Sequence, residues 1–262
     1  MRDLTIILLA AGKSTRFGSP KQLERVGPKG ETIAELTLRD AFAHGCTRAV
    51  IVARPAHEEH FRGMLGADAR AAVVVQNEAL GTAHATMRAL DKSAGTVIIA
   101  NGDDLYGARS MALACDHAIN GTQDEHALVA FTLGNTLSPN GGVNRAVCGV
   151  DEQSRLLSTH EVKGLSRNSD SGIMDEHGRV WGDDAPVSMN LWVMRPSMRG
   201  FFTAGFSHRV AGTEFGLPDV VGAAIRGNER FRVLTSPDRW LGLTFAEDAQ
   251  LVRDQLREQH GP

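Results

Sequence analysis

Residues 8–21 read Leu-Leu-Ala-Ala-Gly-Lys-Ser-Thr-Arg-Phe-Gly-Ser-Pro-Lys, and they complete an apolar run that begins at Leu4. Such a short run predicts a strand covered on both faces, and the glycine-rich segment after it predicts a tight turn. The run is too short to cross a bilayer, and the single Arg2, cancelled by Asp3, does not make the basic start of a signal peptide. We therefore expect a cytoplasmic protein with no membrane partner.

The turn carries residues suited to anion binding. Its Gly-Lys-Ser-Thr run is not a P-loop, because that motif needs a glycine where this chain has Ile7. Small residues nevertheless allow backbone N–H groups to approach phosphate oxygens, and Arg16 and Lys21 bring fixed positive charge. The alternative is an ordinary glycine-rich strand-to-helix turn with two solvated cations.

Composition narrows the class of protein. The chain has 262 residues, 28 Lys and Arg against 31 Asp and Glu, and a net charge of −3, which argues against a dedicated nucleic-acid binder. Three widely separated cysteines form neither a disulfide framework nor a zinc pattern, and they fit a reducing compartment.

Apolar runs alternate with helical patterns over the first half of the chain. The runs that predict strands are Leu4–Ala10, Arg48–Ala53, Ala72–Gln76, Thr96–Ala100 and His126–Leu133. The patterns that predict helices are Ile33–His44, Ala56–Leu65 and Thr82–Leu90. This alternation predicts an α/β fold of Rossmann-like type, a mostly parallel twisted sheet flanked by helices.

The second half follows a different pattern. Residues 134–186 are rich in Gly, Asn, Ser and charge, and they predict scattered short strands in a lobe inserted into the same domain. Pro186–Met194 predicts a strand that returns to the main sheet, and Ala246–Gln259 predicts a closing amphipathic helix. We expect one domain over 1–262, divided into a first half (1–133), an inserted lobe (about 134–190) and a closing part (191–262).

The pattern Leu-Ala-Ala-Gly-x-x-x-Arg at 9–16, followed by Pro20-Lys21, resembles the signature of the nucleotidyltransferase family. Members of this family join an NTP to a phosphorylated acceptor and release pyrophosphate. The resemblance implies a GT-A-type sheet whose first half binds the nucleotide and whose inserted lobe binds the acceptor. It implies that Arg16 contacts the outgoing phosphates and that Lys21 stabilises charge at the reacting phosphorus. The residues implied to hold the nucleotide are Leu9, Ala10, Ala11, Gly12 and Lys13.

The branch of the family is not settled by this loop. The sugar-phosphate branch usually has a second glycine where this chain has Ser14, which is more similar to the molybdopterin branch.

Residues 76–85, Gln-Asn-Glu-Ala-Leu-Gly-Thr-Ala-His-Ala, resemble the base-recognition segment of N-acetylglucosamine-1-phosphate uridylyltransferases. The resemblance implies that Gln76, Gly81 and Thr82 contact a pyrimidine nucleotide, and a carboxamide has the donor and acceptor that a pyrimidine edge requires. The alternative is a strand end followed by a helix that Thr82 caps. We interpret His84 as part of the helix surface or core.

Asn101-Gly102-Asp103-Asp104 follows another expected strand. Adjacent carboxylates suit a hard divalent cation that substrate phosphates also hold, and the family has its metal aspartate at the position of Asp103. We therefore expect Mg²⁺ as cofactor; alternatively, Asp104 caps the next segment. The loops at Gly12, 76–82 and Asp103 all follow expected parallel strands, whose carboxyl ends bind ligands in open α/β sheets.

The second metal ligand of the family does not match. An Asp or Asn stands before the last helix in relatives, where this chain has Thr244. Either Thr244 acts through water, or the metal relies on Asp103, Asp104 and phosphate oxygens.

Further segments resemble the acceptor-binding elements of sugar nucleotidyltransferases. The residues implied to meet the acceptor are Gly142, Arg145, Glu161, Lys163 and Asn190. The run 214–219 resembles another family segment, but we interpret it as the packed entry to a helix.

The sequence thus predicts a Mg²⁺-dependent nucleotidyltransferase with a pyrimidine NTP and a sugar-1-phosphate as its substrates. Alternatives within the class are cytidylyl transfer to a non-sugar phosphate, a phosphonate or molybdopterin, and residues 80–85 and the long lobe disfavour the last. A glycosyltransferase is disfavoured by Arg16 and Pro20-Lys21. A silent regulatory nucleotide-binding relative stays open on the strength of Thr244. The acceptor, the NTP and any homo-oligomer are not readable from the sequence.

Overall fold

The structure, a computed structural model, describes residues 3–12, 21–168, 172–243 and 247–260. Its main strands are β1 (Leu4–Ala10), β2 (Arg48–Ala53), β3 (Ala71–Val75), β4 (Thr96–Asn101), β6 (Glu125–Thr132), β7 (Val143–Val150), β8 (Leu156–Asn168), β11 (Pro186–Met194) and β12 (Arg230–Thr235). Shorter strands are β5 (Asp104–Leu105), β9 (Gly172–Met174), β10 (Val180–Trp181) and β13 (Leu241–Gly242). The α-helices are α1 (Ile33–Ala43), α2 (Glu58–Leu65), α3 (Thr82–Leu90), α4 (Ala108–Asn120), α5 (Met198–Ser207), α6 (Leu217–Arg226) and α7 (Asp248–His260). Short 3₁₀ turns are η1 (Lys21–Leu23), η2 (Pro55–His57) and η3 (Leu133–Thr136).

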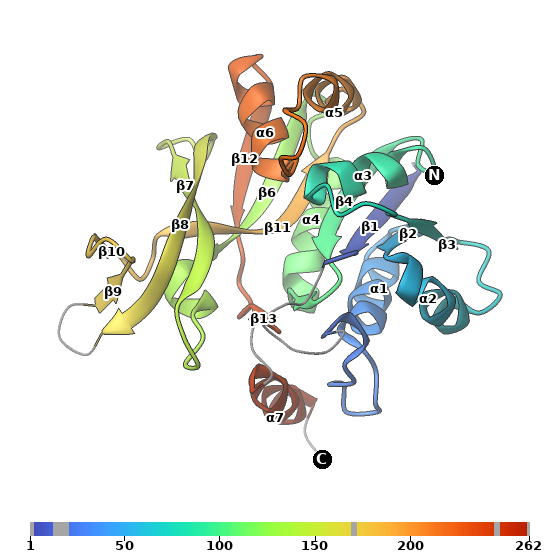
Figure 1. The fold of residues 1–262 in the computed structure, drawn as a ribbon, viewed down its shortest axis with the longest axis horizontal. Coiled ribbons are helices and arrows are strands. Elements are labelled where there is room, and N and C mark those ends of the chain that lie inside the picture. Colours follow the sequence, from blue (N-terminus) through green and yellow to red (C-terminus); the bar gives the residue numbers. More distant parts are fainter. Residues whose placement is uncertain (1–2, 13–20, 169–171, 244–246, 261–262) are drawn as a thin grey trace.

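The central sheet has the order β3-β2-β1-β4-β11 and continues into β7, β8, β9 and β10 (Figure 1). β3, β2, β1 and β4 are all parallel, as expected, and β11 returns antiparallel to β4. β6 pairs with β11, and β12 pairs with β6. The predicted mixed α/β fold with a largely parallel sheet is therefore confirmed.

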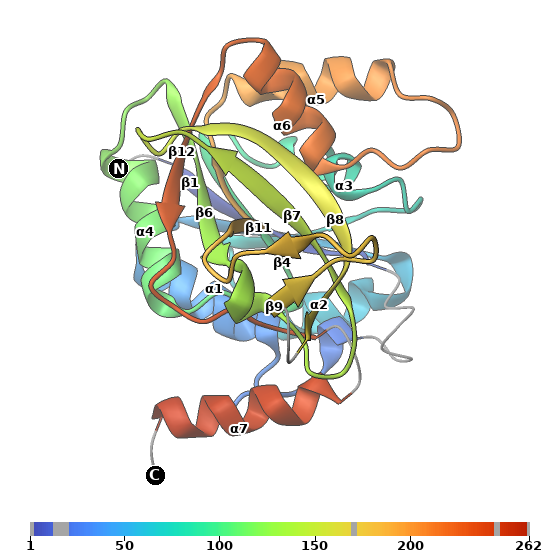
Figure 2. The ribbon, with the colours of Figure 1, turned by 90° about the vertical axis from the view of Figure 1, so that its left-hand side faces the viewer.

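Helices cover the sheet on both faces. One apolar cluster contains buried residues of α1, α2 and α4, and a second contains buried residues of α3, α5 and α6. A third, smaller cluster joins α7 to α1, β5 and β13, so that α7 lies at the end of the molecule seen at the bottom of Figure 2. Within the described part of the chain, no helix is both long and apolar enough to span a bilayer.

The apolar runs and helical patterns locate most of the elements that they predict well. β1, β2, β11 and α3 have the predicted bounds, and β3, β4 and α1 differ from prediction by a residue at one or both ends. The predicted helix at 56–65 is divided into η2 and α2. β3 is half-buried along its whole length, unlike the prediction of cover on both faces, because it is the last strand of the sheet.

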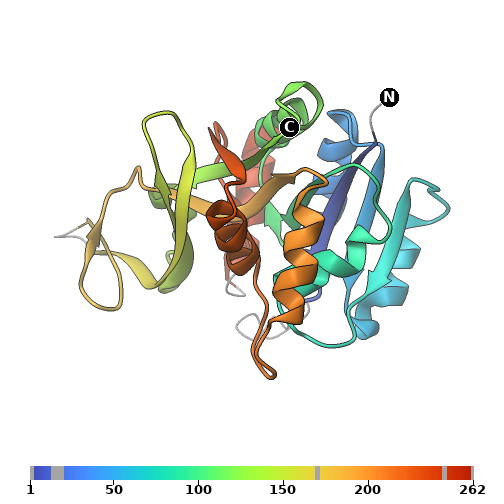
Figure 3. The same ribbon diagram turned by 90° about the horizontal axis from the view of Figure 1, so that it is seen from above.

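The inserted region is more regular than predicted. Instead of scattered short strands, it contains the long antiparallel pair β7–β8, with a 13-residue β8. Most residues of β8 are exposed or half-buried, so the strand lacks the apolar signal that marks a covered strand. Seen from above in Figure 3, β7–β10 lie on the opposite side of the molecule from β1–β3.

The three cysteines are free and buried. Sγ of Cys46 lies 3.9 Å from Sγ of Cys115, and both residues belong to the apolar cluster between the sheet and α4. Packing therefore accounts for their position.

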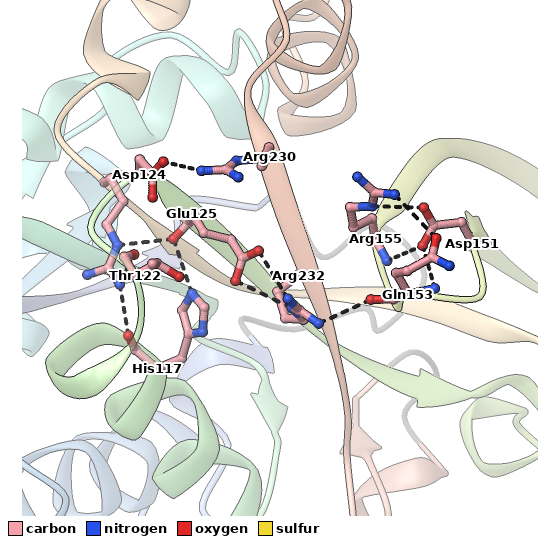
Figure 4. Close-up of polar contacts among 10 residues, drawn as sticks. His117, Thr122, Asp124, Glu125, Asp151, Gln153, Arg155, Arg230 and Arg232 are labelled. Carbon is pink, nitrogen blue, oxygen red and sulfur yellow. Dashed lines mark hydrogen bonds and ion pairs between the residues drawn. The ribbon is translucent and has the colours of Figure 1, made fainter.

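The turn between β7 and β8 is fastened to β12 (Figure 4). Arg232 on β12 contacts the carboxylate of Glu125 on β6 at 3.3 Å and donates to the carbonyl of Gln153 at 3.1 Å. The backbone N–H of Val233 also donates to Ser154 O at 2.8 Å. These contacts hold one end of the β7–β8 hairpin against the main sheet.

Arg195, which follows β11, anchors the end of α4. Its guanidinium is 3% exposed, and it donates to Ala118 O at 2.7 Å, His117 O at 2.8 Å and Glu125 O at 3.1 Å. His117 and Ala118 lie in the last turn of α4, where the negative end of the helix dipole attracts a cation, and His117 O also accepts from the N–H of Gly121.

We expect Arg195→Met to lower the free energy of unfolding by about 3 kcal/mol, because it removes the charged donor that several buried carbonyls share. Urea unfolding measures this loss. Arg226→Met, on the exposed end of α6, is the matched control and costs within about 0.5 kcal/mol. Equal unfolding midpoints for the two variants would contradict the anchoring role.

His126 is held in its neutral form. Its ring is fully buried, Nδ1 accepts from the backbone N–H of Arg195 at 3.0 Å, and Nε2 donates to Glu229 at 2.8 Å. Burial, opposed in part by Glu229, lowers the pKa of His126 below its ordinary value.

A lowered pKa means that the folded state binds fewer protons than the unfolded state. The contribution of His126 to stability is therefore complete above about pH 6.5 and is lost as the pH falls below that value. We expect the free energy of unfolding to fall less steeply from about pH 7.5 to 5.5 in His126→Asn than in the parent chain. Urea titrations at several pH values test this, and parallel slopes would refute it.

Candidate active site

The ends of β1 and β4 lie at the same level of the sheet. Leu9 pairs with Asn101, and the backbone N–H of Gly102 donates to Leu9 O at 3.0 Å. The carboxyl ends of adjacent parallel strands therefore bring Gly12 and Asp103 to one edge, as the sequence predicts. Leu9, Ala10 and Ala11 are buried at this end of β1. Three predicted site residues, Lys13, Arg16 and Thr244, lie outside the described residues.

Lys21 meets Asp103 at this edge. The side chain of Lys21, at the start of η1, forms an ion pair with the carboxylate of Asp103. Its Nζ also donates to Leu243 O at 2.9 Å, just after β13. The two side chains are 21% and 14% exposed, so they remain reachable while being largely shielded from water. Two residues that the sequence assigns to catalysis are thus in direct contact.

Asp104 lies beneath this pair. It is 6% exposed and accepts from Asn101 Nδ2 at 2.7 Å. Burial, together with the charge of Asp103, raises the pKa of Asp104 to about 7. The alternative in which Asp104 caps the next segment is wrong: Gly107 is the N-cap of α4, and the N–H of Ser110 donates to Asp238.

Tyr106 and Asn190 complete this polar network. The Tyr106 hydroxyl accepts from the N–H of Asn101 at 2.8 Å and donates to Met189 O at 2.8 Å. Asn190 Nδ2 contacts Asn101 Oδ1 at 3.4 Å. Sequence reasoning gave Asn101 and Tyr106 no role, although Tyr106 is the only tyrosine of the chain and follows the aspartates closely.

Asn190 has an unusual backbone. Its φ is +64°, in the left-handed region that residues other than glycine rarely adopt. The pairing of β11 with β6 shifts in register between Ser188 and Trp192, so Asn190 sits in the middle of an irregularity. This irregularity lets one strand pair with β7 at its start and with β4 at its end.

The predicted acceptor residues are divided between two faces of the β7–β8 hairpin. Glu161 pairs with Ala146, which in turn pairs with Ser188, so these three residues share a face. Arg145 is adjacent to Ala146 on β7 and points to the opposite face. Gly142, Glu161 and Lys163 are exposed.

Arg145 is built into the fold. It is 8% exposed, donates to Thr136 O at 3.1 Å and stacks over the Trp240 ring at 4.8 Å. Its charge lies close enough to Asp104 to lower the pKa of that carboxyl, against the larger effect of burial. The structure therefore points Arg145 to the face of β7 opposite to that of Ala146 and its partner Glu161.

A groove of about 670 Å³ lies between the β7–β8 hairpin and the β9–β10 segment. Its lining includes Glu161 and Lys163 but none of Lys21, Gln76 and Asp103. His160 lines it too and shares a face with its partner Val147, opposite to that of Glu161. The groove is thus distinct from the Lys21–Asp103 contact.

Residues 76–84, the segment after β3 that the resemblance implies contacts the base, are named the base loop. Gln76 is 5% exposed, and its Nε2 contacts Gly81 O at 3.1 Å and His84 Nδ1 at 3.0 Å. Gly81 is the N-cap of α3, so the interpretation of Thr82 as the cap is wrong. The Thr82 hydroxyl instead accepts from the N–H of Leu217 at 2.9 Å, at the start of α6.

Residues between α5 and α6 support the base loop. The N–H of Phe215 donates to Leu80 O at 2.7 Å, and Phe215 O accepts from the N–H of Ala83 at 3.0 Å. Phe215 is buried, and α6 begins at Leu217, which confirms the interpretation of 214–219 as a packed helix entry. Gly81, with φ of +99°, lies directly against the carbonyl of Phe215.

We expect Gly81→Ala to cost about 3 kcal/mol of stability, because a Cβ there collides with the Phe215 backbone in addition to the strain of a positive φ. Gly178→Ala is the matched control. Gly178 has a φ of +79°, and an added Cβ meets no described atom within 4 Å, so the strain alone costs about 1 kcal/mol. Chemical denaturation compares them, and equal losses would show that the contact with Phe215 is unimportant.

Comparisons with known proteins agree with this geometry. The model of the MobA-like NTP transferase domain matches residues 6–148. Among curated proteins, the bifunctional protein GlmU of Trichlorobacter lovleyi is 36% identical over an alignment of 267 positions that covers 97% of this chain and 53% of that protein. GlmU of Xanthobacter autotrophicus is 36% identical over 107 residues, 39% of this chain and 23% of that protein. The chain thus matches between about a quarter and about half of the length of these relatives.

Solved structures share the fold along the whole chain. The inositol-1-phosphate CTP transferase of T. maritima has a TM-score of 0.71 at 15% identity and covers 98% of both chains. A Bacillus anthracis protein described as a candidate glucose-1-phosphate thymidylyltransferase has a TM-score of 0.74 at 12% identity, covering 97% of this chain and 96% of that one. Because the family model covers more than half of the 262 residues, the chain belongs to the MobA-like NTP transferase domain family.

Proposed function

We propose that the protein transfers a nucleotidyl group from an NTP to a phosphorylated acceptor and releases pyrophosphate. The observation that carries this proposal is the contact between Lys21 and Asp103 at the carboxyl ends of β1 and β4. A cation and a carboxylate at this edge suit the binding of a metal-chelated triphosphate. Membership of the family supports the same reaction.

The residues present fit a bound Mg²⁺. Asp103 and Asp104 offer hard oxygen donors side by side, and Asp103 is the more exposed of the two. In the described residues no group of three or more His, Cys, Asp or Glu side chains comes together as a metal cage. Mg²⁺ is commonly held by one or two carboxylates together with substrate phosphates, so we propose Asp103 as the main protein ligand. The ion would supply positive charge to the phosphates.

The proposed reaction needs no general base. An oxygen of the acceptor phosphate is already ionised at neutral pH; it forms a bond to the α-phosphorus as the bond to the pyrophosphate oxygen breaks. Catalysis then depends on in-line positioning and on neutralising the charge at the α-phosphate. Lys21 is well placed for this task, since its Nζ lies at the site edge against Asp103. We propose that Arg16 steadies the departing pyrophosphate.

We propose a pyrimidine as the base and a sugar-1-phosphate as the acceptor. The contacts of Gln76 with Gly81 and His84 support a base loop built around one carboxamide. Proteins that share the fold are described as an inositol-1-phosphate CTP transferase and a candidate glucose-1-phosphate thymidylyltransferase, which supports a pyrimidine NTP and a phosphorylated sugar or alcohol. Residues 1–133 would bind the nucleotide with Gly12 and Thr82 among the contacts, and the lobe at about 134–190 would bind the acceptor.

The acceptor side of the proposal depends on exposed residues. Glu161 and Lys163 would contact it from one face of the lobe, with Gly142 close by. Asn190 would reach it from the middle of β11, where its side chain contacts Asn101. A grid of five NTPs against phosphorylated sugars and alcohols, scored by pyrophosphate release, identifies the pair; no release from any pair would refute the proposed function.

We expect Lys21→Ala to reduce turnover by roughly 10²–10³-fold, about 3–4 kcal/mol, because it removes charge stabilisation at the reacting phosphorus. Pyrophosphate release at saturating substrate measures this loss. Lys29→Ala is the matched control, since Lys29 is exposed and lies a short distance further along the chain. Near-normal turnover in Lys21→Ala would exclude its proposed role, whereas an equal loss in Lys29→Ala would point to damage of the local fold.

A further inference from the structure

The side-chain amide of Gln76 has two possible orientations, which exchange the positions of its oxygen and its nitrogen. Its contacts allow only one of them. One end of the amide contacts Gly81 O at 3.1 Å, and a carbonyl oxygen only accepts hydrogen bonds. That end must therefore be the NH₂ group. The same nitrogen lies 3.0 Å from Nδ1 of His84, so Nδ1 must be unprotonated and accept. Both N–H groups of the amide are then used within the base loop.

The hydrogen-bond acceptor of His84, its Nδ1 atom, is itself held in position. His84 lies in the first turn of α3, and its ring stacks on Phe206 of α5 at 5.2 Å with an interplanar angle of 15°. Phe206 in turn packs against Phe215, whose backbone supports the base loop. The imidazole can neither rotate freely nor leave Gln76 without disturbing this stack.

The charged groups around His84 favour its neutral form. Burial lowers the pKa of His84, and Arg88 on α3 and Arg209 after α5 act in the same direction. Glu78 in the base loop opposes them with a smaller effect than that of Arg88. A neutral imidazole with its proton on Nε2 is the form that can accept from Gln76.

We propose that His84 is a positioning residue that, together with Gly81 O, holds the amide of Gln76 so that the amide oxygen alone is presented to the nucleobase. This inference rests on the proposed function and deepens it. A carboxamide that rotates freely can hydrogen-bond to either a donor group or an acceptor group on the nucleobase. A carboxamide that is fixed with Oε1 outward selects a base edge that carries an N–H donor. The substrate class is then an NTP whose base donates to Gln76.

Two substitutions of His84 separate positioning from packing. His84→Phe keeps a ring that stacks on Phe206 but removes the hydrogen-bond acceptor Nδ1. His84→Asn places a carbonyl oxygen close to the position of Nδ1 and so keeps a hydrogen-bond acceptor for the Gln76 amide. Thermal unfolding of both variants, compared with the parent chain, reports any loss from packing alone.

The readouts are KM and kcat for the preferred NTP, and the preference for that NTP over an analogue methylated at the base N–H. We expect His84→Phe to raise KM about three- to tenfold, with kcat changed less than about twofold, since one hydrogen bond that orients a binding group is lost. Its preference over the methylated analogue falls, because Gly81 O alone then holds the amide, which turns its NH₂ outward more often. We expect His84→Asn to recover most of both effects.

A pH series gives an independent check. In the parent chain, KM for the NTP rises as the pH falls, because protonated His84 can no longer accept a hydrogen bond at Nδ1. KM in His84→Asn does not show this rise. A parent-like KM and base preference in His84→Phe would overturn the proposal. So would equal effects of the two substitutions, since His84→Asn retains the acceptor.

The proposed function and this inference fail in different ways. If the parent chain releases no pyrophosphate from any substrate pair, the proposed function is wrong, and equilibrium dissociation constants for the same NTPs replace KM in testing His84. If the parent turns over and His84→Phe retains its base preference, only the role of His84 is wrong. Absence of NTP binding by the parent chain refutes both.

Discussion

The parallel pairing of β1 with β4 is the constraint on which the candidate site depends. Because Leu9 lies beside Asn101, both strands end at the same edge, and the glycine-rich loop and the two aspartates leave the sheet side by side. Both strands are buried, which fixes their register. Lys21 reaches from η1 to Asp103 and to the carbonyl of Leu243, so it links the first loop, the end of β4 and the segment after β13.

The base loop depends in a similar way on residues far along the chain. Leu80 and Ala83 exchange backbone hydrogen bonds with Phe215, and Thr82 receives the N–H of Leu217. Residues 76–84 are therefore shaped by the α5–α6 connection, more than 120 positions later. The proposed nucleotide contacts fall within residues 1–133. The geometry of that half nevertheless depends on residues outside it, between α5 and α6.

The features of the fold that could be predicted are those that a local pattern of apolar residues marks in the sequence. β1, β2 and α3 are marked by apolar runs or helical spacing, and the loops after the parallel strands follow from that assignment. β8 was not predictable as a 13-residue strand, because most of its side chains are exposed or half-buried. The resemblance implies that Arg145 meets the acceptor, and the contact of its guanidinium with the Trp240 ring was not predictable from the motif. The shifted register around Asn190 likewise depends on the competing pairings of β11, which no local pattern encodes.

The proposed chemistry gives Lys21 and Asp103 different partners, a phosphate for the first and a cation for the second. In the structure they pair with each other, and both are largely shielded from solvent. A charge shielded in this way is costly without a partner, so each residue compensates the other. Substrate phosphates and a cation can replace those partners without leaving either charge uncompensated, because an anion and a cation arrive together. The ion pair thus makes the charged site compatible with a stable fold, and under the proposed function it would give way to a metal-chelated nucleotide.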